Sequence, residues 1–218
     1  MTNPIKLDII SDVVCPWCVV GYKHLEAAIH ELNLQDKVEI EWQPFELNPD
    51  MPVEGEELRA HLARKYGSTR EDSDRVRNDL TQRGALYDFQ FDYFDGMKMV
   101  NTFDAHVLLD LAHQLGKQTE LKLRLFSAFF TERKDVSDRE VLINEAQAVG
   151  IDAEQALVAL DDQSIRRQIK ETEQQWQQMN ISGVPTVVFN RASAMTGAQT
   201  QEGYKQVLLE LMDKNTSS

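Results

Sequence analysis

The sequence predicts an α/β fold in which one mixed sheet is flanked by helices and an all-helical domain is inserted between its strands. Three observations lead to this prediction. Strand-like segments occur near both ends of the chain, at 5–10 and 37–47 and again at 184–197. Helical periodicity of apolar residues fills more than a hundred residues between them. A strand, a helix and a second strand follow one another at the start, in the order of a βαβ unit.

The opening βαβ unit is read from two alternating segments and the helix between them. Apolar and polar side chains alternate along 5–10 and again along 38–42, and Pro44 ends the second strand. Residues 21–29 fit a helix. Because such crossovers are right-handed, we expect the two strands to be parallel.

The middle of the chain reads as helices. A turn-forming segment, Asn48 to Pro52, marks the boundary, and the pair Ser137 and Glu140 has the spacing of a capping box. The expected helices are 57–66, 73–83, 103–116, 119–132, 137–150, 152–160 and 161–179, with an aromatic-rich loop over 84–101.

The last forty residues return to β character. Residues 184–190 and 192–197 read as a hairpin, and 200–213 as a final helix. We therefore expect a discontinuous sheet domain, formed by residues 1–52 and 178–218, and an inserted helical domain over 53–177.

The chain has two cysteines, and both lie in the motif Cys15-Pro16-Trp17-Cys18 at the junction of the first strand and helix. The free N–H groups and positive dipole of a helix start stabilise a thiolate, and cysteines so placed in Cys-X-X-Cys motifs have low pKa values. Proline suits the first helical turn. We interpret Cys15 as the attacking thiolate and Cys18 as the resolving thiol.

Three other interpretations of the cysteine pair compete with this one. A zinc site needs two further ligands, and no second cysteine pair or clustered histidines are evident, so we expect no metal. A purely structural disulfide would close too small a loop to stabilise a chain of 218 residues. Two unrelated buried cysteines are the third alternative.

Composition restricts the class of partner and the location. The formal net charge of −13 disfavours nucleic acid and anionic membranes, both of which bind basic surfaces. No window approaches 18 uncharged apolar residues, which excludes a membrane-spanning helix. The first strand begins within a few residues of Met1 and leaves no room for a secretory signal. We expect a cytoplasmic protein, where a lone Cys-X-X-Cys more often serves redox chemistry than structure.

A set of motifs gives the chain a family resemblance. Residues 11–18 read SDVVCPWC and continue to Gly21, residues 182–186 read SGVPT, and residues 196–199 read TGAQ. This combination resembles the thioredoxin-fold DsbA-like oxidoreductases, most closely their FrnE-like branch, over effectively the whole chain. The resemblance implies a thioredoxin-like fold.

The resemblance also implies a substrate-binding surface formed by Val184, Pro185 and Trp17. The Val184–Pro185 peptide is expected to be cis, which exposes the backbone of Val184 to an extended substrate. An ordinary trans proline at the start of a strand is the alternative. Because Trp17 stands where periplasmic members have histidine, we expect a redox potential between about −120 mV and about −270 mV.

Asp12 and His106 are further candidates. Asp12 precedes Cys15 by three residues and either caps the helix or transfers a proton during exchange. His106 either faces the cysteines from the helical domain or is an ordinary core histidine. A substrate groove or domain packing would explain the aromatic residues Phe89, Phe91, Tyr93 and Phe94.

The predicted function is thiol–disulfide exchange on protein or small-molecule thiols and disulfides, with no required cofactor and with glutathione as a redox partner. A glutathione-dependent isomerase or transferase of the kappa-class or hydroxychromene-carboxylate isomerase type is the first alternative, although Cys18 would be superfluous for it. A redox-sensing binding protein is the second.

Overall fold

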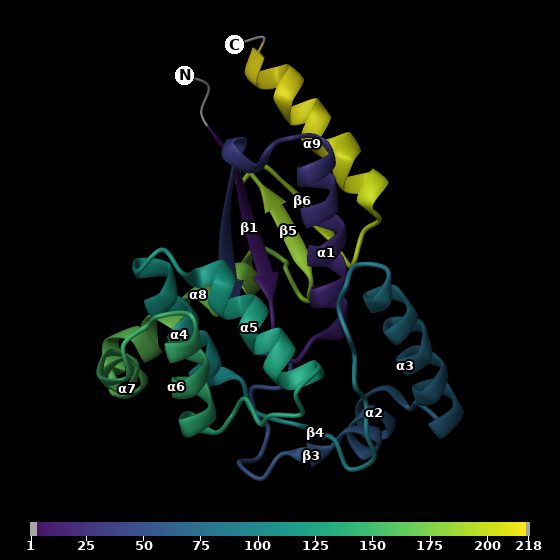
Figure 1. The fold of residues 1–218 in the computed structure, drawn as a ribbon, viewed down its shortest axis with the longest axis vertical. Helices are drawn as coiled ribbons and strands as arrows, with labels where there is room; N and C mark the ends of the chain where they lie inside the picture. Colours follow the sequence, from purple (N-terminus) through teal and green to yellow (C-terminus); the bar gives the residue numbers. More distant parts are fainter. Residues whose placement is uncertain (1–3, 217–218) are drawn as a thin grey trace.

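A four-stranded mixed sheet lies at the centre of the computed structural model, which describes residues 4–216. The strand order is β2-β1-β5-β6 (Figure 1). Strand β1 (Ile5–Ser11) pairs in parallel with β2 (Val38–Pro44) and antiparallel with β5 (Thr186–Phe189). Strand β6 (Ser193–Thr196) completes the hairpin with β5. The predicted mixed sheet flanked by helices is confirmed.

Two helices from opposite ends of the chain pack together on one face of this sheet. Helix α1 (Pro16–Glu31) connects β1 to β2 through a short 3-10 turn, η1 (Gln35–Lys37). Helix α9 (Gln201–Thr216) lies beside α1, as Figure 1 shows. Tyr204 and Leu25, on these two helices, are fully buried, so the contact belongs to the apolar core.

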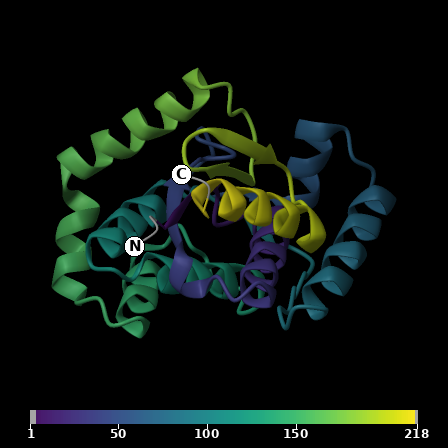
Figure 2. The ribbon, with the colours of Figure 1, turned by 90° about the horizontal axis from the view of Figure 1, so that it is seen from above.

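The chain between β2 and β5 forms seven of the described helices. Figures 1 and 2 show α2 and α3 on one side of the sheet and α4 to α8 on the other. Their bounds agree with the expected segments to within about three residues. They are α2 (Leu58–Tyr66), α3 (Arg70–Ala85), α4 (Phe103–Gln114), α5 (Gln118–Phe130), α6 (Arg139–Ala148), α7 (Ala153–Asp161) and α8 (Gln163–Gln178).

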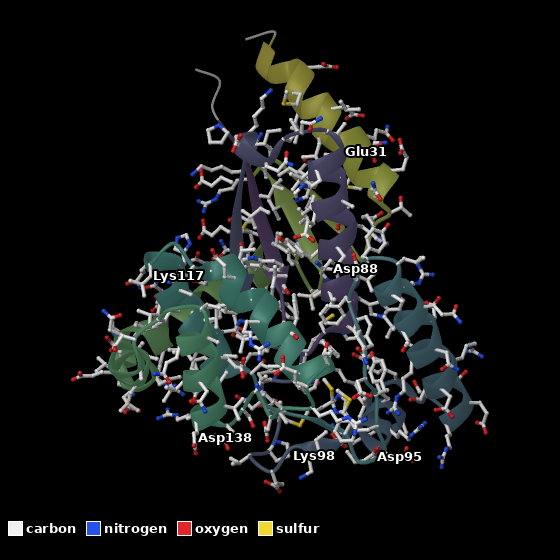
Figure 3. All side chains as sticks on the ribbon, viewed as in Figure 1. Glu31, Asp88, Asp95, Lys98, Lys117 and Asp138 are labelled. Atoms are coloured by element: carbon white, nitrogen blue, oxygen red, sulfur yellow. The ribbon has the colours of Figure 1, made fainter. Side chains whose placement is uncertain are left out.

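A two-residue ribbon is an element that the sequence pattern did not predict. Strand β3 (Glu56–Glu57) pairs antiparallel with β4 (Lys98–Met99). Lys98 lies at the end of the molecule remote from both termini (Figure 3), and its ammonium donates a hydrogen bond of 2.9 Å to the carbonyl of Glu54. Two residues are too few to show alternation, so the ribbon has no periodic signal.

The predicted capping box at Ser137 and Glu140 is wrong. Asp138 caps α6 instead, because its carboxylate accepts hydrogen bonds from the backbone N–H groups of Glu140 and Val141. The Ser137 hydroxyl is directed to Asp135, to which it donates at 2.6 Å. Aspartate and serine are nearly equivalent N-caps, which is why the pattern misplaced the start by one residue.

The helices between β2 and β5 share one hydrophobic core with the sheet. Trp42 of β2 lies between Tyr22 of α1 and Phe126 of α5, with ring centroids 4.9 and 6.0 Å away. Gln118 of α5 extends the pairing of β2, since its side-chain amide bonds both the N–H and the carbonyl of Trp42. These contacts place α4 and α5 beside the end of β1, where the two cysteines lie.

Candidate active site

The end of β1 and the start of α1 place Cys15 at the N-cap of the helix. Its φ of −92° and ψ of 111° are extended, and Pro16 occupies the first helical position. The N–H of Cys18 bonds the Cys15 carbonyl at 3.1 Å. No acidic residue lies in the first turn of α1, so no carboxylate within that turn offsets the positive end of the helix dipole next to the thiol.

The two cysteines are reduced and differ in accessibility. The side chains are buried, with 3% of Cys15 and 1% of Cys18 exposed. Cys15 lines a cavity of about 310 Å³, together with Pro16, Trp17 and Val184, whereas Cys18 does not reach it. A substrate in this cavity therefore meets Cys15 first.

The thiols titrate as a pair because they share a hydrogen bond. The bond to Cys18 and burial raise the pKa of the Cys15 thiol well above its ordinary value. Burial opposes ionisation of Cys18 as well, but the neighbouring Cys15 and Ser11 side chains and the charge of Lys122 lower its pKa. The reduced pair thus keeps its proton on Cys15 rather than on Cys18.

The loop before β5 lies next to Cys15. The Val184–Pro185 peptide is cis, and the Val184 carbonyl accepts a long hydrogen bond from the Cys15 thiol, with 3.9 Å between sulfur and oxygen. Gly21 of α1 permits this approach, because a Cβ there would lie 3.2 Å from the Pro185 ring. The structure thus brings together Cys15 and Val184, which are 169 positions apart.

Trp17 is half-exposed beside this loop. Of its surface, 37% is accessible, and the guanidinium of Arg83 lies 5.9 Å from its ring centroid. The indole lines the cavity with Cys15. It offers an apolar surface next to the reactive sulfur.

Asp12 does not cap α1, so that interpretation is wrong. Helix α1 has no side-chain cap, because the Asp12 carboxylate is turned away to accept a hydrogen bond from the Leu47 N–H at 2.7 Å. Its other oxygen lies 3.5 Å from Nε2 of His106. Burial opposes ionisation, but His106, Leu47 and Lys122 hold the pKa of Asp12 below its ordinary value. His106 faces this carboxylate from α4 and is itself buried.

Lys122 is a site residue that the sequence reasoning missed. It lies on α5 with 1% of its surface exposed. Its ammonium is 3.4 Å from the Ser11 carbonyl and about equally far, 5.2 and 5.1 Å, from the ring centroids of Trp42 and Phe126. Burial lowers its pKa to about 8, against the attraction of Cys18 and Asp12. The available signal was a four-residue spacing, since Gln118, Lys122 and Phe126 share the buried face of α5.

Two glutamates form a second unpredicted cluster behind Asp12. The backbone N–H of Glu46 donates to the Glu173 carboxylate at 2.8 Å, and Asn101 donates to the Glu46 side chain at 3.2 Å. Burial, with the charges of Glu173 and Asp12, raises the pKa of Glu46 to about 8. Glu46 is therefore largely protonated at neutral pH.

The four aromatic residues after α3 divide between packing and the cavity. Phe91 is buried against Phe89 and Phe130, with centroids 4.8 and 5.1 Å away. Of the four, Tyr93 lines the cavity that contains Cys15. The packing interpretation therefore holds for Phe91, whereas Tyr93 is placed where it could contact a molecule in the cavity.

Comparison with known proteins decides the family. Residues 6–209 match the family described as DSBA-like thioredoxin domain. The chain belongs to this family.

Similar proteins span nearly the whole chain. The uncharacterized protein YwbO of Bacillus subtilis (strain 168) is 24% identical over 96% of this chain and 98% of its own length. A probable DsbA oxidoreductase, SCO1869 from Streptomyces coelicolor, is 30% identical in structure alignment, with a TM-score of 0.88 over 94% of this chain and 89% of its own. The cytosolic disulfide reductase DsbM from Pseudomonas aeruginosa, solved with GSH, shares the fold at 19% identity, with a TM-score of 0.60 over 95% and 99%.

The described residues contain neither a helix suited to cross a membrane nor a group of metal ligands. None of the helices within 4–216 has the length and apolar character needed to cross a membrane. Over the same residues, no three histidine, cysteine, aspartate or glutamate side chains are grouped as ligands for a metal ion.

Proposed function

We propose that the protein is a thiol–disulfide oxidoreductase in which Cys15 attacks and Cys18 resolves, with protein disulfides and dithiols as substrates. The position of the Cys15 sulfur carries this proposal: it opens to the cavity beside the Val184 carbonyl, while Cys18 lies behind it. Family membership supports the reaction class.

The reaction begins with proton transfer inside the cysteine pair. The Cys15 proton passes to Cys18, whose pKa is the lower of the two, as Cys15 attacks one sulfur of a substrate disulfide. The substrate S–S bond breaks, a substrate thiolate leaves, and a mixed disulfide with Cys15 forms. Cys18 then passes its proton to the released substrate thiolate and attacks the Cys15 sulfur. The Cys15–Cys18 disulfide forms, the second substrate thiolate leaves, and the substrate has gained two electrons. The reverse sequence oxidises a dithiol.

The surrounding residues bind the substrate backbone and set the charge. The exposed backbone at Val184 and Pro185 pairs with an extended substrate, and Trp17 contacts its apolar side chains. Asp12 and His106 do not line the cavity that Cys15 lines, and they act by positioning charge near the cysteines. We further propose that residues 1–52 with 178–218 and residues 53–177 form two domains, that the protein works in the cytoplasm, and that glutathione is a redox partner without a bound cofactor being required.

The first test is equilibration of the protein in glutathione buffers, with the Cys15–Cys18 disulfide quantified by thiol labelling. A reversible two-electron transition between about −120 and about −270 mV supports the proposal. The absence of an intramolecular disulfide contradicts it, and a Cys15→Ser variant gives the baseline. The Cys18→Ser variant separates exchange from isomerase chemistry, because it should trap substrates as mixed disulfides on Cys15.

A further inference from the structure

The cavity beside Cys15 contains a buried guanidinium without an acceptor. Arg77 of α3 lines this cavity and has 8% of its surface exposed. Within the described residues, its Nε and Nη2 atoms are buried and have no hydrogen-bond partner. A guanidinium stays charged in proteins, and a buried charge is ordinarily paired.

Two further polar groups of the same cavity also lack partners among residues 4–216. They are the hydroxyls of Ser73 and Tyr93, both buried. The Arg77 guanidinium lies 5.4 Å from the Tyr93 ring centroid. Three residues that line the cavity with Cys15 therefore carry unsatisfied buried donors, and such groups are few in native proteins.

The nearby charges do not satisfy Arg77. Asp74 pairs with Arg59 at 2.7 Å. The lining carboxylate, Asp72, is held by Thr69 and by Arg75. The lining histidine, His61, bonds Glu56 at 2.7 Å.

Most of the remaining cavity wall is apolar. Its walls include Leu58, Leu62, Leu80, Met97 and Phe130. Its volume of about 310 Å³ is near the lower end of small-molecule sites. An apolar body would displace water from these walls, and an anionic group would give Arg77, Tyr93 and Ser73 the acceptor that they lack.

We propose that this cavity binds a low-molecular-weight disulfide, or the corresponding thiol, with an apolar body and a terminal carboxylate held by Arg77. The inference rests on the proposed exchange reaction and adds a low-molecular-weight substrate class to the protein substrates proposed above. Cys15 attacks one sulfur of the small disulfide and the first thiolate leaves. Cys18 then closes the protein disulfide and the second thiolate leaves. The protein dithiol supplies the two electrons, so one turnover needs no further reductant.

The test compares two disulfides of equal shape, bis(4-carboxyphenyl) disulfide and bis(4-carbamoylphenyl) disulfide. Thiol release by excess reduced protein is followed in single turnovers, and the half-saturating concentration is measured for each. We expect the carboxylate to saturate at a concentration about 10- to 100-fold lower, as charge-assisted hydrogen bonds allow. Arg77→Gln should abolish this preference. Arg70→Gln, which removes an exposed charge from the start of the same helix, outside the cavity lining, should keep it.

Two outcomes overturn the inference: equal or reversed preference in the unmodified protein, or a preference that survives Arg77→Gln. The first needs no variant, so it holds even if Arg77→Gln does not fold. A peptide disulfide that reacts faster than both aryl disulfides, with no carboxylate preference, would assign the cavity to peptide substrates instead.

A binding measurement separates this inference from the proposed function. The Cys15→Ser variant cannot exchange, yet by calorimetry it should bind 4-(methylthio)benzoate more tightly than the corresponding amide. If the carboxylate binds but no disulfide releases thiol, the exchange reaction is contradicted and the carboxylate site is not. If thiol is released without a preference for the carboxylate, the role of Arg77 in binding the carboxylate is contradicted and the exchange reaction is not.

Discussion

Replacing Lys122 with methionine removes a buried positive charge while keeping the side chain's length and its packing against Trp42 and Phe126. The ammonium lowers the pKa of Cys18. At an effective dielectric of about 20 and a separation of roughly 5–8 Å, one unit charge contributes about 2 kcal/mol. This corresponds to a rise of about 1.5 units in the Cys18 pKa. The thiolate population at a pH below that pKa then falls about 30-fold.

The expected loss of rate is smaller than the loss of thiolate. A thiolate of higher pKa is a better nucleophile, with a Brønsted coefficient of about 0.4–0.5. The rate constant of the remaining thiolate therefore rises about fivefold. We therefore expect Lys122→Met to slow attack by Cys18 on the mixed disulfide about sixfold. Because the pKa of Lys122 itself is about 8, its charge is lost above that pH, and the two proteins should converge there.

The assay is single-turnover thiol release from 4,4′-dithiodipyridine, which carries no carboxylate. The first equivalent reports attack by Cys15 and the second reports resolution by Cys18. We expect slowing in the second phase near neutral pH and little near pH 9. Lys6→Met, which removes an exposed charge at the end of β1 opposite to Cys15, is the control. An unchanged or faster second phase at neutral pH would refute the role assigned to Lys122.

Three further changes have defined outcomes. Asp12→Asn removes a negative charge that raises the pKa of Cys15, so the pKa of Cys15 should fall by about one unit. The rate of Cys15 alkylation, measured against pH in a Cys18→Ser background, reports this pKa. An unchanged profile would contradict the effect assigned to Asp12. Glu46 has a raised pKa, so the folded state binds more protons than the unfolded state between about pH 4.3 and about 8, and stability declines as pH rises through this window. Glu46→Gln should remove that decline, roughly 1 to 2 kcal/mol after solvent screening, in denaturant titrations at both ends of the window. Asp138→Ala should cost about 1 kcal/mol of unfolding free energy by losing the α6 cap, whereas Ser137→Ala should cost less than half of that.

Periodicity was enough to predict the sheet and the helices. The apolar residues of β1 reflect its central position, since six of its seven residues are buried, and the spacing of apolar residues in α4 and α5 reflects the faces that they bury. Both patterns are local, so they can be read before any partner is known. The β3–β4 ribbon is too short to carry such a pattern, and it forms because distant segments meet.

The candidate site was predictable only where its residues form a contiguous motif. The Cys-X-X-Cys spacing predicts the roles of Cys15 and Cys18, and the residues around Pro185 predict its place in the site. Lys122 and Arg77 do not, because lysine and arginine are ordinary surface residues of helices. Their burial is decided by which element packs over them, and that information is absent from the local sequence.

The central position of β1 has a consequence for synthesis of the chain. One edge of this strand pairs with β2 early, but the other waits for β5, because Ile10 lies opposite Thr186. At a synthesis rate of about 5–20 residues per second, the time between synthesis of β1 and synthesis of β5 is roughly 10–35 s. An apolar strand with an open edge is a template for pairing with other chains. During this interval the nascent chain presents that edge next to a reactive thiol, so neighbouring ribosomes on one message would be the first source of unintended partners.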